Sequence, residues 1–327
     1  MDNSPVSAAT VAHFNGINPS NLARNYKAHL SDFEIWDQKA HAQEWILYGE
    51  NIGKHVCIDE VALSQGELYT VVSNASSACQ KGSLIAMIKG TKAEEVKAVL
   101  SKIPVDQRIK VQEVSVDLAA NMEKIATESF PYASVVSDRF HVQRLCSEAV
   151  QHIRIKHRWQ AIDEENQEAK KAREKGEKYY PIVLSNGDTK KQLLARSRYL
   201  LFKTENQWTN SQKQRAKLLF ELYPDVQHAY HLSLSFRNIY HSARSRQHAN
   251  QLFFHWKRNV IERNLDPFQK VIASVETHQH TILNYFVNRS TNALAESLNS
   301  KIKIFRAQFR GVRDIPFFLY RLSMILA

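Results

Sequence analysis

The segment VSVDLAANMEKIATESFPYASVVSDRFH, residues 114–141, contains two short apolar stretches that each end in an aspartate. Asp117 follows the first stretch and Asp138 follows the second, and an amphipathic segment ending at Phe130-Pro131 separates them. A strand, a helix and a strand of this length predict a right-handed parallel crossover. Because open α/β sheets place their chemistry at the carboxyl ends of parallel strands, both aspartates are candidates for a cation site.

The chain before this segment has the pattern of three antiparallel strands followed by a helix. Asp59 lies in the middle of the first expected strand, HVCIDEVALS, where a carboxylate is costly unless it is paired or binds a cation. Glu60 falls on the opposite sheet face by strand alternation, so we expect a structural or supporting role for it. The sequence therefore predicts an α/β fold with a mixed sheet. The expected strands and the helix span residues 55–64, 68–72, 83–89 and 93–102.

Residues 7–33 have the pattern of two short helices joined by a turn. On the second helix, Leu22, Tyr26 and Leu30 recur at i, i+4 and i+8 and predict an apolar stripe. One interpretation is a helix-turn-helix in which Arg24 and Lys27 face DNA. The other is a helical hairpin that covers the next domain. Residues 36–48 are expected to form a third helix.

The composition is that of an ordinary soluble protein with much helix. The chain has 327 residues, of which 43% are apolar and 24% charged, and only nine glycines. Its three cysteines lack CxxC spacing, so neither a disulfide framework nor a zinc finger is indicated. No apolar run approaches the roughly 20 residues of a membrane span. We therefore expect a cytoplasmic protein without a membrane partner.

Positive charge is confined to the second half of the chain. Residues 1–138 hold 12 Lys and Arg against 17 Asp and Glu, whereas residues 139–327 hold 32 against 16. A basic half beside an acidic half suggests a nucleic-acid surface next to a cation site. Solvated basic helix faces without any ligand are the alternative.

Residues 139–295 are expected to be almost entirely helical, and they carry 26 Lys and Arg against 14 Asp and Glu. Arg237, Arg244 and Arg246 cluster with histidines and Tyr240 in a pattern suited to phosphate contacts, although a solvated helix face would have the same composition. The mixed-charge run at residues 163–178 is expected to be an exposed helical arm or a mobile loop.

A late helix carries another acid among amides and bases. Its apolar face holds Leu294, Leu298, Ile302 and Phe305, while a second face holds Asn292, Glu296, Asn299 and Lys303. A carboxylate between hydrogen-bond donors suits a metal-and-phosphate surface, and an amphipathic helix with a surface glutamate is the alternative. The basic residues that follow Glu296 and are expected to contact DNA are Lys301, Lys303, Arg306, Arg310 and Arg313.

Over residues 55–327 the sequence resembles the DDE transposases of bacterial insertion sequences, closest to the ISL3 group. The segments that carry the resemblance are VCIDEVAL, VSVDLAANM, FPYASVVSDRFHV and NALAESLNSKIKIFRAQFRGVRD. The resemblance implies a ribonuclease-H-like catalytic core with a large all-helical insertion before the glutamate helix.

For the active site, the resemblance implies metal-dependent DNA cleavage at the element ends, followed by strand transfer into target DNA. Asp59, Asp117 and Glu296 would hold two Mg²⁺ ions, with Mn²⁺ as a substitute. Asp138 is the alternative to Asp117, since both end strands. In the favoured assignment Asp138 and His141, with Asn292 and Asn299, support the site, and Arg139 contacts DNA.

The expected organisation is a helix-turn-helix-like region (1–50), a first part of the catalytic core (51–142), a basic helical insertion (143–287) and a last part of the core (288–327). The expected partners are double-stranded DNA and at least one further copy of the chain, in the nucleoid. Similar transposases begin with a cysteine-rich zinc-binding segment, so a separate small DNA-binding protein is a further expected partner. The alternatives to a transposase are an inactive or domesticated DNA-binding protein and a nuclease or resolvase that only cuts.

Overall fold

The computed structural model describes residues 1, 4–64, 66–77, 80–289, 293–309 and 312–327. The chain divides into two compact units, which are described one at a time. The sheet unit comprises Met1–Arg139 and Asn288–Ala327, and the helical unit comprises Phe140–Val287.

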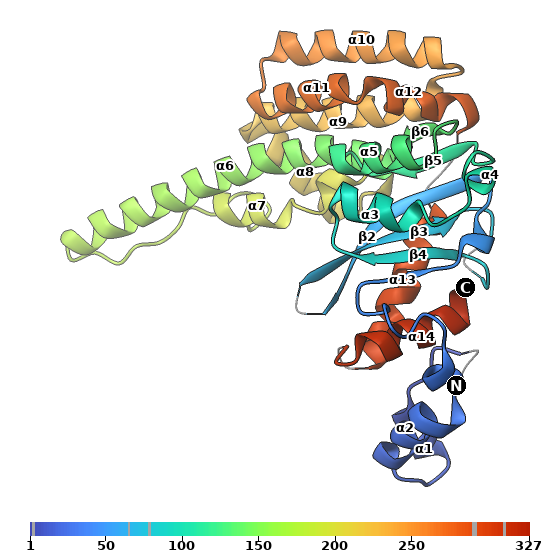
Figure 1. Ribbon diagram of the computed structural model, residues 1–327. Coiled ribbons are helices and arrows are strands. Elements are labelled where there is room, and N and C mark those ends of the chain that lie inside the picture. Colours follow the sequence, from blue (N-terminus) through green and yellow to red (C-terminus); the bar gives the residue numbers. More distant parts are fainter. Residues whose placement is uncertain (2–3, 65, 78–79, 290–292, 310–311) are drawn as a thin grey trace. The chain divides into compact units, whose positions relative to one another are not determined.

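Six strands form one mixed sheet in the order β1-β4-β3-β2-β5-β6 (Figure 1). Neighbours in the series β1, β4, β3 and β2 pair antiparallel, whereas β2–β5 and β5–β6 pair parallel. This is the ribonuclease-H-like mixed sheet that the sequence predicted, with β1 added at one edge. The strands are β1 (Trp45–Leu47), β2 (His55–Ser64), β3 (Glu67–Asn74), β4 (Leu84–Lys89), β5 (Glu113–Val116) and β6 (Ser134–Ser137).

Each face of the sheet is buried under a pair of helices, because side chains alternate along a strand. Val56 and Ile58 pack in one core with α3 (Ala93–Leu100) and α5 (Ala120–Ser129). Val61 and Leu63 pack in the other core, with α13 (Ala293–Gln308) and α14 (Ile315–Leu326). The short helix α4 (Val105–Arg108) precedes β5.

The N-terminal region contains α1 (Ala8–Phe14) and α2 (Pro19–Asn25), capped by Ser7 and Asn18. A π-helical turn, Tyr26–Leu30, continues α2 and shifts the phase of the helix. Tyr26 is therefore buried while Leu30 is 66% exposed, so the expected apolar stripe does not extend to Leu30.

The prediction of a helix over residues 36–48 is wrong. The structure has a 3₁₀ turn at Asp32–Ile35, turns over residues 37–44, the strand β1, and another 3₁₀ turn at Gly49–Asn51. Pairing of Trp45 with Ile88 of β4 extends the sheet at its edge, and this long-range contact overrides the local helical pattern.

The helical unit is all-α, as the fold prediction required. Phe236, Tyr240, Phe253 and Trp256 form an aromatic core, with the Phe236 and Trp256 rings 4.8 Å apart. No helix in the described part of the chain is long and apolar enough to cross a membrane. The helices are α6 (Arg139–Glu174), α7 (Lys190–Arg196), α8 (Asn210–Leu222), α9 (Pro224–Ser242), α10 (Arg246–Arg263), α11 (Asp266–Thr277) and α12 (Gln279–Asn288), with 3₁₀ turns at Leu200–Phe202 and Glu205–Gln207.

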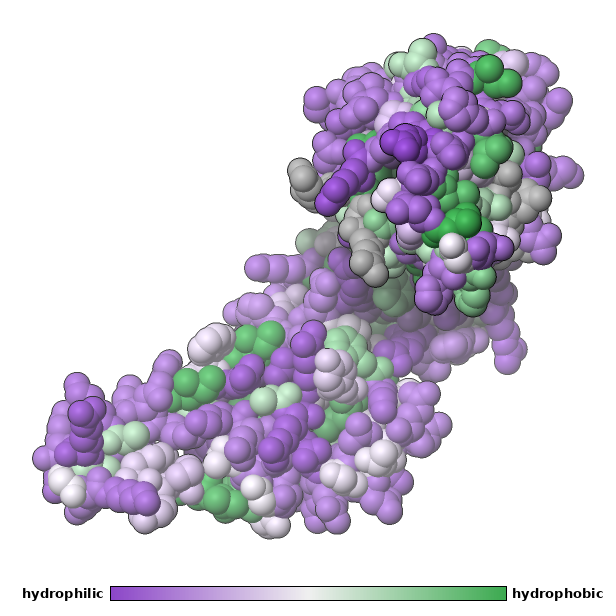
Figure 2. All heavy atoms as spheres, turned by 90° about the horizontal axis from the view of Figure 1, so that it is seen from below, coloured by the Kyte–Doolittle hydropathy of each residue, from purple (hydrophilic) through white to green (hydrophobic). Residues whose placement is uncertain are grey.

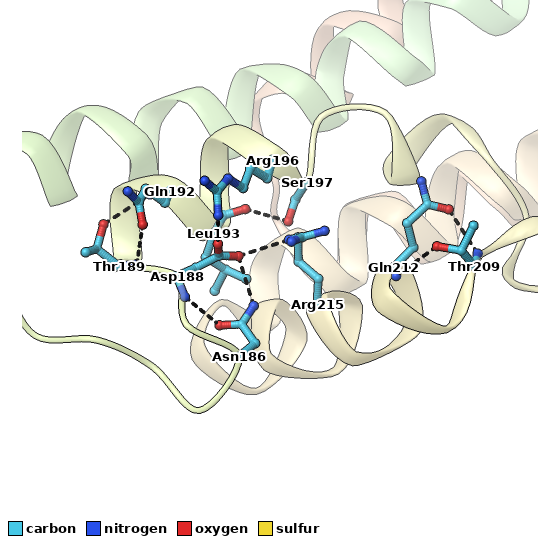
Figure 3. A network of polar contacts seen from close by, with 10 residues as sticks. All are labelled: Asn186, Asp188, Thr189, Gln192, Leu193, Arg196, Ser197, Thr209, Gln212 and Arg215. Atoms are coloured by element: carbon cyan, nitrogen blue, oxygen red, sulfur yellow. Dashed lines mark hydrogen bonds and ion pairs between the residues drawn. The ribbon is translucent and has the colours of Figure 1, made fainter.

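A buried carboxylate fastens the loop before α7 to α8. Asp188, 1% exposed, accepts hydrogen bonds from Arg215 Nε at 3.0 Å, from Asn186 Nδ2 at 2.9 Å and from Arg196 (Figure 3). Burial alone would raise the pKa of Asp188, but the hydrogen bonds and charges of Arg215 and Arg196 outweigh it and lower that pKa. Asp188 is therefore ionised, and its role is to hold the loop before α7 against α8.

Candidate active site

Three aspartates lie in one row across the parallel strands, and we call them the acid row: Asp59, Asp117 and Asp138. The β2–β5 register pairs Cys57 with Ser115, and continuing it by two residues places Asp59 beside Asp117. The β5–β6 register pairs Val116 with Ser137, and one more residue places Asp117 beside Asp138. A 2.8 Å hydrogen bond from Asp138 N to Val116 O shows that the ladder continues past the strands.

The acid row belongs to the sheet face that α13 covers. Val56 of β2 and Val114 of β5 point into the core beneath α3 and α5. Because side chains alternate along a strand, Asp59 and Asp117, each an odd number of residues further on, point to the other face. A 2.6 Å hydrogen bond from Asn299 Nδ2 on α13 to Asp59 Oδ2 agrees with this orientation. The two residues are 240 positions apart in the sequence.

The described donors to the first two acids are neutral. Besides the Asn299 amide, Asp59 Oδ1 accepts the backbone N–H of Glu60 at 2.7 Å. Asp117 is half-buried, and its Oδ1 accepts the backbone N–H of Leu118. These hydrogen bonds fix the orientation of the two carboxylates.

A fourth carboxylate, that of Glu60, lies within the electric field of this row. Burial raises the pKa of Glu60, and the negative charges of Asp117 and Asp59 raise it further. Strand alternation had suggested a structural or supporting role for Glu60, and it gave no sign of the coupling to Asp117. Crowded acids of this kind favour a bound cation.

Helix α13 brings Glu296 to the same side of the sheet. Ile302 and Phe305 of this helix are buried in the core against β2, and Arg306 donates a hydrogen bond to Ala62 O. Glu296 is exposed and lies three residues, or about one turn, before Asn299. The fixed position of Asn299 on Asp59 therefore holds Glu296 about one turn from the acid row.

The donor chemistry fits a hard cation, although the geometry of a closed metal site is not preformed. Carboxylate oxygens are the ligands that Mg²⁺ prefers, and Asp59, Asp117 and Glu296 supply only such oxygens. Among the described residues, no three His, Cys, Asp or Glu side chains are grouped closely enough to hold a metal ion.

The proposed supporting residues lie around the end of β6. Asp138 is 5% exposed, and Arg139 begins α6 and is half-buried. His141 lies in the first turn of α6. Asn292, expected one helical turn before Glu296, lies outside the described residues.

Two of the basic residues expected to contact DNA have roles within the sheet unit. Lys27 forms an ion pair with Asp314, which caps α14, and its Nζ lies 5.1 Å from the centre of the Phe33 ring. Arg306 holds the Ala62 carbonyl as described above. Four other bases of this unit that were expected to contact DNA are exposed: Arg24, Lys301, Lys303 and Arg313. Arg310 lies outside the described residues.

In the helical unit the expected DNA-binding residues lie near the junction of α9 and α10. Arg237 is half-buried and donates to Phe202 O at 3.2 Å, whereas Arg244 and Arg246 are exposed. The sequence interpretation missed the Asp188 cluster, whose partners Arg196 and Arg215 are too distant along the chain to suggest a shared carboxylate.

Comparison with known proteins agrees with the architecture. The family model of ISL3-type DDE transposases, described as a transposase, matches residues 56–322, which run from β2 through most of α14. A search of curated proteins gave no significant match. Because the family match spans the acid row, the helical unit and the glutamate helix, the chain belongs to the ISL3 family of DDE transposases.

Proposed function

We propose that this transposase cleaves DNA at the ends of an insertion sequence and joins those ends to target DNA, with Asp59, Asp117 and Glu296 as metal ligands. The observation that carries the proposal is the β2–β5 register, which places Asp59 in the middle of β2 beside Asp117 at the carboxyl end of β5. The hydrogen bond from Asn299 to Asp59 joins α13 to this pair. Family membership supports the general activity.

The chain's own residues would position the reacting groups. The strands fix the backbone positions of Asp59 and Asp117, and Asn299 orients the Asp59 carboxylate. The metal ions we propose are two Mg²⁺, with Mn²⁺ as a substitute, and when bound they supply charge stabilisation at the phosphate and activation of the attacking oxygen.

We assign Asp117, rather than Asp138, as the second ligand. Asp117 is half-buried, whereas Asp138 is 5% exposed. A ligand of a metal that acts on duplex DNA must be reachable by a phosphate, and this favours the more exposed acid. Asp138 and His141 then support the end of β6, and Arg139 is proposed to contact DNA.

The exposed bases are proposed to bind the duplex backbone. Residues 139–295 carry 26 Lys and Arg against 14 Asp and Glu, an excess that suits phosphate contacts. Lys27 pairs with Asp314 and Arg306 bonds to the Ala62 carbonyl. We therefore propose that the main phosphate contacts of the sheet unit are made by Arg24, Lys301, Lys303 and Arg313. In the helical unit the exposed Arg244 and Arg246 would contribute, together with the half-buried Arg237, whose guanidinium has further N–H donors besides the one that bonds to Phe202 O.

The activity is tested with a labelled duplex carrying the terminal sequence of the element and a supercoiled target plasmid, in Mg²⁺, Mn²⁺ or EDTA. We expect joined products with either ion and none in EDTA. Asp59→Asn, Asp117→Asn and Glu296→Gln should abolish joining but keep binding to the duplex.

Other outcomes assign other functions. Cleavage that never leads to joining would make the protein a nuclease, and binding without cleavage would make it a DNA-binding protein. Wild-type joining by Asp117→Asn or Glu296→Gln would contradict the proposed ligands.

The proposed partner requirements have a separate test. If a small DNA-binding protein is needed, the chain alone should bind the terminal duplex no better than a scrambled duplex of the same length. High-affinity, sequence-specific binding by the chain alone would show that no such protein is required. We propose that the complex acts in the nucleoid and contains at least two copies of the chain.

A further inference from the structure

The distal half of α6 forms an exposed arm within the helical unit. The 36 residues of this helix span about 54 Å, and beyond Ala161 each of its residues is exposed or half-buried. Figure 1 shows this part of α6 extending past α7, with the segment that leads back to α7, residues 175–189, beside it. We call residues 175–189 the returning segment. We call residues 155–174 the arm.

One side of the arm faces the returning segment. The half-buried residues Ile162, Glu165, Ala169 and Ala172 recur at i, i+3, i+7 and i+10, which defines one helix face. Glu165 forms an ion pair with Lys191, so this face is held within the chain.

A different side of the arm, about a third of a turn around the helix from that face, carries an exposed stripe that begins with an aromatic residue. Trp159 is 62% exposed, and large aromatic side chains of this kind are usually buried at least in part. The surface at this end of the helical unit is mostly hydrophilic, as the left of Figure 2 shows. The stripe, which we call the arm stripe, consists of Trp159, Asp163, Asn166, Gln167, Lys170 and Arg173.

The charge along the arm changes sign at its middle. Residues 163–168 contain four acids and no base, whereas residues 169–178 contain five bases and two acids. The whole run is therefore close to neutral, unlike the basic unit around it, and it is a poor surface for DNA phosphates. Glu164 and Glu165 already pair with Lys190 and Lys191 of the same chain, so the acid that the arm stripe presents is Asp163. An acid followed along the stripe by Lys170 and Arg173 is complementary to the same stripe running in the opposite direction.

We propose that the arm stripe pairs antiparallel with the arm stripe of a second copy of this chain. A two-fold axis between Asn166 and Gln167 would place Asp163 of one copy opposite Lys170 of the other, and Trp159 near Arg173. Each ion pair and each cation–π contact then occurs twice. The inference does not rest on the proposed chemistry, because the pairing needs neither metal nor DNA.

The test is sedimentation equilibrium of the full chain, without DNA or metal, at protein concentrations up to about 100 µM, the range for weak association. Asp163→Lys or Lys170→Asp should each weaken dimerisation about tenfold or more, because like charges would meet across the axis. The double variant with both changes should return to within about threefold of the wild type, because opposite charges again face each other.

Cysteine cross-linking tests the position of the axis. In a Cys79→Ser background, with Cys57 and Cys146 buried, Gln167→Cys should form a disulfide-linked dimer on mild oxidation. The matched control Glu168→Cys is exposed but lies on another side of the helix, and it should cross-link far more slowly. A monomeric wild type at the highest concentration, a charge exchange that fails to restore dimerisation, or equal cross-linking of the two cysteines would overturn the proposal.

Discussion

The acid row and the Asp188 cluster are two groups of charged residues that the fold treats in opposite ways. In the helical unit, Asp188 lies between two arginines, and its pKa is lowered. In the sheet unit, Asp59 accepts hydrogen bonds from an amide and a backbone N–H. Burial raises the pKa of the neighbouring Glu60, and the charges of Asp117 and Asp59 raise it further.

This difference matches the proposed division between a structural site at Asp188 and a metal site at the acid row. A carboxylate paired with guanidinium groups is already neutralised, so its role is to hold the loop before α7 against α8. Carboxylates placed close together on neighbouring strands repel each other, and this arrangement is useful where a cation is to be bound. We therefore expect substitutions in the acid row to lower activity and substitutions at Asp188 to lower the free energy of unfolding.

The largest effect is expected at the acid row. Asp59→Asn or Asp117→Asn should lower the strand-transfer rate about 10³-fold, since loss of a metal ligand removes several kcal/mol of charge stabilisation. The melting temperature in EDTA should stay unchanged or rise slightly, because a like-charge repulsion is relieved. A large loss of stability would make these acids structural instead.

The opposite pattern is expected at Asp188. Asp188→Asn leaves two arginines without their buried partner and should cost about 3 kcal/mol of unfolding free energy in urea titrations. The exposed pair Lys217–Glu221 provides the control, since Glu221→Gln should cost less than about 0.5 kcal/mol. Equal costs for the two changes would contradict the structural role of Asp188.

The stabilisation by Asp188 should also depend on pH with a defined sign. Its folded pKa lies below the ordinary value of 3.8, so the stabilisation is complete above that value and is lost as the pH falls through the folded pKa. The stability difference between wild type and Asp188→Asn should therefore be constant from neutral pH to about pH 5 and shrink below pH 4. A difference that grows on acidification would contradict the assignment.

An intermediate effect is expected for Asn299. Asn299→Ala removes the donor that orients Asp59, and loss of such supporting hydrogen bonds typically lowers metal affinity or activity about 10- to 100-fold. The control is Ser300→Ala, because the Ser300 hydroxyl donates to the Glu296 carbonyl of the same helix. The difference should be seen mainly in the Mg²⁺ concentration that gives half-maximal joining, and an unchanged Mg²⁺ dependence would contradict a positioning role.

The smallest effect is expected for Glu60. Because its folded pKa is raised, the contribution of Glu60 to stability should fall as the pH rises from about 4.5 through that pKa. The effect should be below about 1 kcal/mol at this half-exposed position. Glu60→Gln should remove this fall in urea titrations from pH 4 to 7. An identical pH dependence in both proteins would show that Glu60 does not sense the acid row.

Local patterns in the sequence predicted most of the sheet. The apolar run with Asp59 became β2, and the two stretches that end at Asp117 and Asp138 became β5 and β6. The edge strand β1 was not predictable from its own residues, because it is stabilised by pairing with β4, about 40 residues away.

The arrangement of the acids was only partly predictable. Alternation placed Asp59 and Glu60 on opposite faces, but only the strand register shows that Asp117 and Asp138 continue the row from Asp59. The bond between Asn299 and Asp59 depends on how α13 packs, which a helical pattern alone does not determine. The Asp188 cluster was missed for the same reason, since it forms only when α7 and α8 come together.

The most direct test of the central claim is metal rescue at Asp117. A thiolate is a poor ligand for Mg²⁺ but binds softer ions such as Mn²⁺ better. We expect Asp117→Cys to join terminal DNA at a background rate in Mg²⁺ and to recover at least about tenfold in Mn²⁺, while Asp117→Ala recovers with neither ion. Wild-type joining by Asp117→Cys in Mg²⁺, or equal recovery of Asp117→Ala in Mn²⁺, would show that this carboxylate is not a metal ligand.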